Sequence, residues 1–234
     1  MRVFQQTIRS LVDENYVYAR ALSYLGVEFY LCPDRKLKDV CQEMGLKKSQ
    51  VLKAFYLFDR SHRFSFSELK NYPIEIVIEY LKHSHHMFIK EKLPYIAGLV
   101  NNYHSEDLKL IFPEFVEEFI NHIYEEEDTV FTYIDQLLEI DKGKFQSIFT
   151  LDSAMSLRQI HREHREEDEL EGIRNLVEEL TLSDLHGQVI EREIKAFDRE
   201  MWYHAEIENK ILFPKAIALE AMVKSKIDEL TKLN

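Results

Sequence analysis

The sequence predicts an all-α protein, in which a small helical N-terminal domain precedes an antiparallel four-helix bundle. Only 6 Gly and 5 Pro occur among 234 residues, whereas sheets and hairpins need frequent turn residues. Long stretches carry apolar residues at helical spacing, with short connections between them. Hydrophobic residues make up 45% of the chain, so we expect a buried core rather than intrinsic disorder.

Residues 1–66 are predicted to form the small domain, from short helices separated by turns. The first helical stretch begins near the N-terminus and ends at Gly26. A second stretch, LKDVCQEMG, ends at Gly45 and is followed by KKSQVLKAFYLFD. Segment 59–73 is polar and has little periodicity, so it is predicted to be a linker.

Residues 74–225 are predicted to form the bundle from four long helices. Pro94 lies inside the first helix and should kink it rather than end it, because the apolar spacing resumes at Tyr95. Asp152 or Ser153 could cap the third helix. The four helices are expected over residues 74–103, 108–140, 151–182 and from about 185 onward.

The charge and the apolar pattern exclude several classes of partner. The formal net charge is −12, a sign that repels phosphate backbones, so nucleic acid is not expected to bind. No run of 18 apolar residues occurs, so no membrane span is expected. Charged residues interrupt the N-terminal stretch, which therefore lacks the apolar core of a signal peptide. Because the chain has only two cysteines, Cys32 and Cys41, the expected location is the reducing cytoplasm.

The most informative pattern is a histidine followed four residues later by a glutamate. The segments HIYEEEDTVF (122–131) and HAEIENKILF (204–213) share the frame HxxxExxxxF, one on the second predicted helix and one on the fourth. Each of the other two helices carries a histidine of its own, His86 or His164. One histidine followed by HxxxE therefore occurs twice, with separations of 36 and 40 residues.

This spacing can bring six ligands to two metal ions. Positions i and i+4 lie about 40° apart on one helix face, so each pair can converge on one centre. Four imidazoles and two carboxylates suit two cations better than one, because each carboxylate can bridge. The candidate ligands are His86, His122, Glu126, His164, His204 and Glu208. The nitrogen-rich set suits two iron ions with an oxo or hydroxo bridge, and leaves zinc or manganese as alternatives.

Other interpretations of these histidines stay open. A single HxxxE on an amphipathic helix is usually a solvated pair, although a purely structural protein would need four such coincidences. His83 and His161, each three residues before a candidate ligand, could reach the site. His85 is expected to point away from it. The histidines expected at the surface are His62, His104 and His186.

Several established motifs are absent from the chain. Ferritin-like di-iron proteins use Glu-x-x-His, and no histidine here has a glutamate three residues before it. His-Glu-x-x-His, GxSxG and GxxxxGK[ST] are also missing. No hydrolase or transferase chemistry is therefore indicated.

These residues resemble the hemerythrin-like cation-binding domain over roughly residues 74–225. The likeness rests on HxxxE on the second helix, on Glu163/His164 on the third and on HAEIENKILFPKA on the fourth. Within that family the chain is similar to the iron–sulfur cluster repair di-iron proteins, whose fourth helix reads H-x-x-x-E-N-x-x-L-F-P. Their first helix has a histidine eight residues before a proline, here His86 and Pro94.

The resemblance implies that the six candidate ligands hold two iron ions, with both glutamates bridging. It implies repair of iron–sulfur proteins damaged by nitrosative or oxidative stress, through iron donation or nitric oxide chemistry. The alternative is a module that binds or senses oxygen or nitric oxide, and a homodimer is left open. Oxygen-carrying hemerythrins use five histidines and an aspartate five residues after the last. Here Glu208 follows His204 by four, which favours reactivity or metal release over oxygen carriage.

The N-terminal domain resembles the cysteine-containing domain of the repair proteins only in part. That domain has adjacent cysteines followed by glycines, whereas the turn here reads Leu31-Cys32-Pro33-Asp34. Cys41 lies nine residues further on, within a predicted helix. The domain is therefore interpreted as a degenerate version that lacks the vicinal thiol pair, and the roles of Cys32 and Cys41 are left open.

Overall fold

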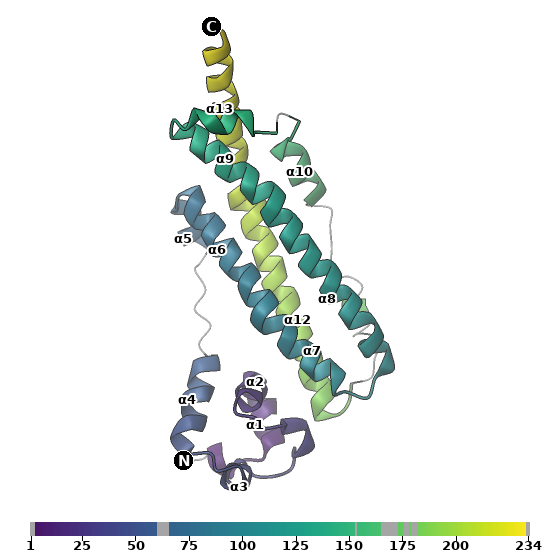
Figure 1. Ribbon diagram of the computed structural model, residues 1–234. Coiled ribbons are helices and arrows are strands. Elements are labelled where there is room, and N and C mark those ends of the chain that lie inside the picture. Colours follow the sequence, from purple (N-terminus) through teal and green to yellow (C-terminus); the bar gives the residue numbers. More distant parts are fainter. Residues whose placement is uncertain are drawn as a thin grey trace. The chain divides into compact units, whose positions relative to one another are not determined.

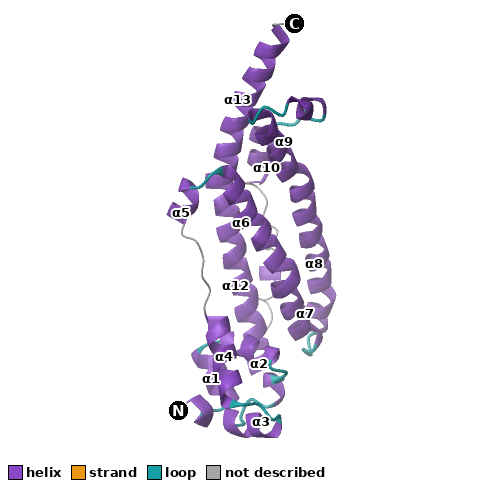
Figure 2. Cartoon of the chain, turned by 60° about the vertical axis from the view of Figure 1, so that its left-hand side comes forward, coloured by secondary structure: helices purple, strands orange, loops and turns teal. Residues whose placement is uncertain are grey.

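Helices account for the regular structure of the described chain, as the computed structural model shows (Figures 1 and 2). The described residues are 3–59, 66–152, 154–164, 173–175, 178 and 182–232. Among them the β-structure is limited to one isolated antiparallel bridge between Thr7 and Lys36. The predicted all-α class is confirmed for this part of the chain. None of its helices combines the length and the apolar character needed to cross a membrane.

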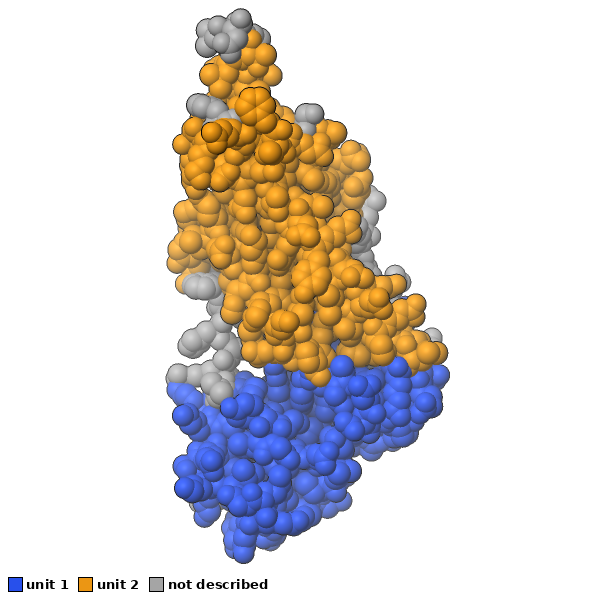
Figure 3. All heavy atoms as spheres, in the orientation of Figure 1, with its two compact units in different colours: residues 1–63, 95–109, 174–197 blue, residues 64–94, 110–173, 198–234 orange. Residues whose placement is uncertain are grey.

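Two compact units make up the chain (Figure 3). The first contains residues 1–63, 95–109 and 174–197. The second contains residues 64–94, 110–173 and 198–234. These groups differ in extent from the predicted domains 1–66 and 74–225, because segments from late in the chain belong to the first unit. The predicted domain boundary stays a prediction.

The N-terminal part of the first unit contains four short helices. Their bounds are α1 Ile8–Glu14, α2 Val17–Tyr24, α3 Leu37–Glu43 and α4 Lys48–Asp59. Gly26 and Gly45 follow α2 and α3 with φ of +79° and +66°, a conformation that glycine adopts without a steric penalty. Both predicted helix ends are therefore confirmed. The two cysteines are free thiols, and Cys41 is buried.

His186, expected at the surface, is instead buried in the first unit. Its ring stacks on Tyr30, with 4.0 Å between centroids and 14° between planes, and Tyr103 meets it edge-on. Burial lowers the pKa of His186. The expectation was wrong because aromatic side chains distant in sequence cover the start of α12, which no local pattern reveals. His104 is exposed, as expected, and His62 lies outside the described residues.

The remaining helices include three that pass through a π-helical turn. The elements are α5 Phe66–Asn71; α6 Ile74–Met87, the π turn Phe88–Lys92 and α7 Leu93–Asn101; α8 Glu106–Glu126, the π turn Glu127–Phe131 and α9 Thr132–Asp141; α10 Leu157–His164; and α12 Leu185–Ile207, the π turn Glu208–Leu212 and α13 Phe213–Lys232. The first of these helical runs continues through Pro94, as predicted. A π turn ends at Lys92, two residues before Pro94, so the backbone hydrogen bonds are already irregular close to the point where the proline removes one.

Two predicted segments differ from the structure. Residues 66–71 of the predicted linker form α5, because Leu69 is buried against the core of the second unit. The third long helix was expected from residue 151, but α10 begins only at Leu157. Asp152 accepts a hydrogen bond from the Ala154 amide, 2.9 Å away, within a turn that precedes the helix. Residues 165–172, 176–177 and 179–181 of that predicted helix lie outside the described residues.

The core of the second unit is formed by apolar faces of α6, α9 and the α12–α13 run, which lie side by side in Figures 1 and 2. Each fully buried large apolar side chain contributes roughly 1.5–3 kcal/mol to folding. One polar contact crosses this core: the buried Tyr133 hydroxyl donates to Glu220 Oε1 at 3.1 Å, and Lys224 Nζ donates to the same atom at 2.9 Å. This contact links α9 to α13.

We expect Tyr133→Phe to lower the free energy of unfolding by about 1–2 kcal/mol, because it removes a hydrogen bond to a carboxylate inside the core. Urea unfolding of the two proteins measures the difference. Tyr124→Phe is the matched control, since Tyr124 is 52% exposed, and should change stability by less than about 0.5 kcal/mol. Equal stability of Tyr133→Phe and the unchanged protein would contradict the role given to this contact.

Candidate metal centre

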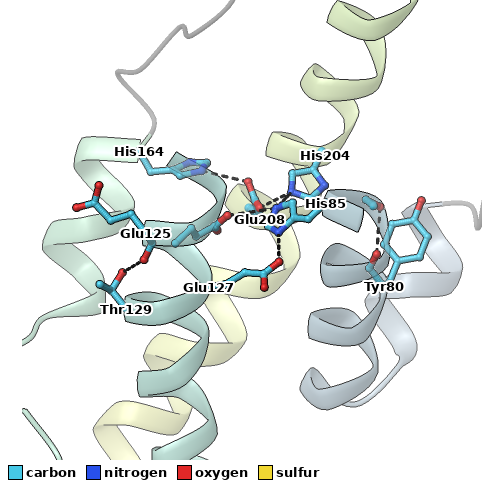
Figure 4. A network of polar contacts seen from close by, with 10 residues as sticks. Tyr80, His85, Glu125, Glu127, Thr129, His164, His204 and Glu208 are labelled. Atoms are coloured by element: carbon cyan, nitrogen blue, oxygen red, sulfur yellow. Dashed lines mark hydrogen bonds and ion pairs between the residues drawn. The ribbon is translucent and has the colours of Figure 1, made fainter. Parts of the chain in front are cut away.

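Four ionisable side chains converge inside the second unit (Figure 4). His85 comes from α6, Glu126 from the end of α8, His204 from α12 and Glu208 from the π turn that follows α12. Each offers one ligand atom, and these atoms all lie within 4.8 Å of one another. The four residues are between 2% and 6% exposed. Such burial is costly unless the polar groups are paired or bind a cation.

The atoms that face one another are imidazole nitrogens and carboxylate oxygens, the kinds of atom that bind metal ions in proteins. His204 Nε2 lies 2.9 Å from His85 Nε2 and 2.7 Å from Glu208 Oε1. His85 Nε2 also lies 3.4 Å from Glu126 Oε2. Metal–ligand bonds of about 2.0–2.2 Å place neighbouring ligand atoms roughly 3–3.5 Å apart. The measured separations are of that order, so the group could hold a metal ion.

A second glutamate orients the His85 ring. Glu127 Oε1 lies 2.8 Å from His85 Nδ1, and the ring lies nearly parallel to Phe131 at a centroid distance of 5.7 Å. Burial, together with the nearby His204 and His122 and against the opposing effect of Glu208, lowers the pKa of His85 to about 3. The ring is therefore neutral at pH 7. With Nδ1–H donating to Glu127, the Nε2 lone pair is available to a cation.

Glu208 lies between two histidines, one on each of its oxygens. Oε1 is 2.7 Å from His204 Nε2, and Oε2 is 3.1 Å from His164 Nε2. Burial alone would raise the pKa of Glu208, but His204 and His164 lower it well below the ordinary value. The carboxylate is therefore ionised. A buried, ionised carboxylate with an imidazole on either side could help to hold a metal ion.

The structure brings five of the six predicted ligands to this region. Three of them, Glu126, His204 and Glu208, belong to the group of four. His164 contacts Glu208, and the half-buried His122 ring lies 6.5 Å from the His164 ring.

The sixth predicted ligand, His86, is exposed, and His85 occupies the position expected for it. The assignment of His86 rested on its separation of 36 residues from His122 and, through the family resemblance, on its spacing from Pro94. The phase of the helix determines which of the two histidines points inward. His85 follows the buried Leu81 by four residues and the buried Ile78 by seven, so it lies on the buried face of α6. That apolar stripe is the signal in the sequence that identifies His85.

The two histidines whose participation was left open differ in position. His83 is exposed. His161 is half-buried, and its ring stacks on Phe213 with a centroid distance of 4.8 Å. Phe213 also contacts His164, at 5.4 Å. His161 therefore lies beside the centre, and His83 does not.

The three π-helical turns all occur where the helices supply these ligands. Glu208 is the first residue of its turn, Glu126 directly precedes another, and His85 lies three residues before the third. A π turn adds one residue to a helix and is frequent at functional sites. Where α8 enters its π turn, the consecutive residues Glu126 and Glu127 both approach the His85 ring, from its two nitrogens. Sequence spacing did not identify Glu127.

We expect the stability of the metal-free protein to fall as the pH drops below 6.5. His85 has a folded-state pKa of about 3 against an ordinary 6.5, so below pH 6.5 the unfolded chain binds a proton that the folded protein excludes. The loss attributable to His85 should be about 1 kcal/mol between pH 7.5 and 5.5. Urea unfolding with a chelator present measures it. His85→Gln has no titratable side chain at this position, so its free energy of unfolding should depend less on pH. Equal slopes of that free energy against pH in the two proteins would refute the explanation.

Comparison with known proteins adds no family to this description: no family model matches the chain, and no curated protein matches it. What the residues themselves establish is a buried cluster of histidine and glutamate side chains that could hold a metal ion.

Proposed function

We propose that the chain is a hemerythrin-like di-iron protein, whose helices form an antiparallel four-helix bundle around two iron ions. The observation that carries this proposal is the position of Glu208, with His204 on one oxygen and His164 on the other. In this arrangement His85 and His204 would hold one ion, and His122 and His164 would hold the second. Glu208 and Glu126 would be the carboxylates that both ions share.

Iron suits this donor set. Imidazole nitrogen and carboxylate oxygen together are typical ligands of iron, zinc and manganese, whereas calcium and magnesium prefer oxygen alone. The two cysteines lie among residues 1–63, in the first unit, so no thiolate from the described part of the second unit competes for soft metals. Bridging carboxylates favour two iron ions, and zinc or manganese would use the same ligands.

The proposed role is repair of iron–sulfur clusters damaged by nitrosative or oxidative stress. It follows from the resemblance of the fourth-helix segment HAEIENKILFP to that of the repair proteins. The iron ions would supply redox chemistry towards oxygen and nitric oxide. The chain contributes an ionised Glu208, a neutral His85 held by Glu127, and the rings of Phe88 and Phe131, which pack against the imidazoles and exclude water.

We expect protein produced with iron to hold about two irons per chain, as in other di-iron helical bundles, and His204→Ala to lose most of them. His204 contacts both His85 and Glu208, so its removal deletes two of the contacts within the buried group together with one ligand atom. Metal analysis and the absorption spectrum measure the result. His104→Ala, at an exposed position in the first unit, is the control and should keep its iron. Unchanged iron content in His204→Ala would refute the centre.

We also expect the loaded protein to transfer iron to a protein whose iron–sulfur cluster has been damaged by nitric oxide. In a defined mixture without other iron, recovery of the partner's cluster absorbance should accompany loss of iron from this chain. Loaded His204→Ala should give little recovery, because it holds little iron to transfer. Full retention of the iron together with reversible binding of oxygen or nitric oxide would instead support the alternative function of gas binding or sensing.

A further inference from the structure

We infer that the two metal positions are unequal, and that the ion on the His122/His164 side is the one that the protein gives up. The inference rests on the proposed dinuclear centre and specifies which of its ions is delivered. The firmly held ion is the one bound by His85 and His204.

The firm position is preorganised by close packing of its ligand atoms. Its four ligand atoms already lie within 4.8 Å of one another, and all four residues are buried. Binding there requires little movement of the side chains and little ordering. Preorganised ligands bind more tightly, because the cost of ordering them was met during folding.

Glu127 should further strengthen metal binding at the firm position. Its carboxylate holds His85 Nδ1 at 2.8 Å, on the opposite edge of the ring from the Nε2 atom that faces the group. A carboxylate behind a ligating imidazole fixes the ring and increases its basicity, and its loss typically costs 10–100-fold in metal affinity. Glu127 is thus a positioning residue for the firm side of the centre.

The other position is less preorganised and closer to solvent. His122 and His164 are both outside the group of four, and 6.5 Å separates their ring centroids. The His164 side chain is 13% exposed, against 5% for His204 and 3% for His85 on the firm side. The exposed Glu125 lies on the same side of the centre in Figure 4. An ion held here would be bound less tightly and would be reached more readily by an acceptor.

The experiment measures release of iron from the loaded, ferrous protein to an excess of a coloured chelator. We expect two phases of similar amplitude, separated by at least about tenfold in rate. His164→Ala and, independently, His122→Ala should remove the fast phase and leave about one ion per chain with the slow rate. Circular dichroism establishes that each variant is folded, and two variants on different helices guard against failure of one.

A matched pair of glutamate substitutions tests the firm side. Glu127→Gln should accelerate the slow phase about tenfold or more and leave the fast phase unchanged. Glu125→Gln, two residues away and exposed, should change neither rate. An accelerated slow phase in both variants would reflect a loss of surface charge and would overturn the role given to Glu127.

Failure of the inference can be told apart from failure of the proposed function. Two bound ions released at a single rate, or loss of both ions from folded His122→Ala and His164→Ala, would overturn the inequality and leave the dinuclear centre standing. A wild-type protein that holds one ion or none would overturn the dinuclear centre itself.

Discussion

The centre depends on one interaction, the burial of the Glu208 carboxylate between two imidazoles. Removing an ionised carboxylate from water costs several kcal/mol unless opposite charge and hydrogen bonds compensate. His204 and His164 face the two oxygens at 2.7 and 3.1 Å and lower the pKa of this carboxyl group. One histidine lies a turn earlier on the same helical run, and the other belongs to α10. The contact therefore fixes the orientation of Glu208 and links α10 to the core of the second unit.

The π-helical turns connect the backbone to this chemistry. An added residue changes which side chains face inward on either side of the turn. In the run from α8 to α9 it lets two consecutive glutamates approach one imidazole. In the other two runs the turn ends two residues before a proline, Pro94 or Pro214. The helix thus continues past a residue that cannot donate a hydrogen bond, and the same irregularity lies beside the ligands.

The sequence predicted three of the four residues of the buried cluster, Glu126, His204 and Glu208, because i, i+4 spacing in a helix fixes which side chains are neighbours. The pair His204/Glu208 was predicted in this way, and its contact is confirmed at 2.7 Å. The choice between His85 and His86 required the phase of the apolar stripe on α6, which also lies in the sequence. The role of Glu127 could not be predicted, because it depends on a π turn that no residue pattern marks. The burial of His186 depends on aromatic side chains remote in the chain.

Stability alone does not account for this cluster. An apolar replacement of a buried ionic group is often as stable or more stable, and a helical core filled with leucine would satisfy the same packing. Two carboxylates and several imidazoles have instead been placed where the surrounding residues are Phe88, Phe131 and Phe213. Local rules of folding are broken in natural proteins chiefly at functional sites. His204 Nε2 faces both His85 Nε2 at 2.9 Å and Glu208 Oε1 at 2.7 Å, so one proton on this nitrogen cannot pair fully with both neighbours. A cation between the two imidazoles and the two carboxylates would satisfy all four groups at once.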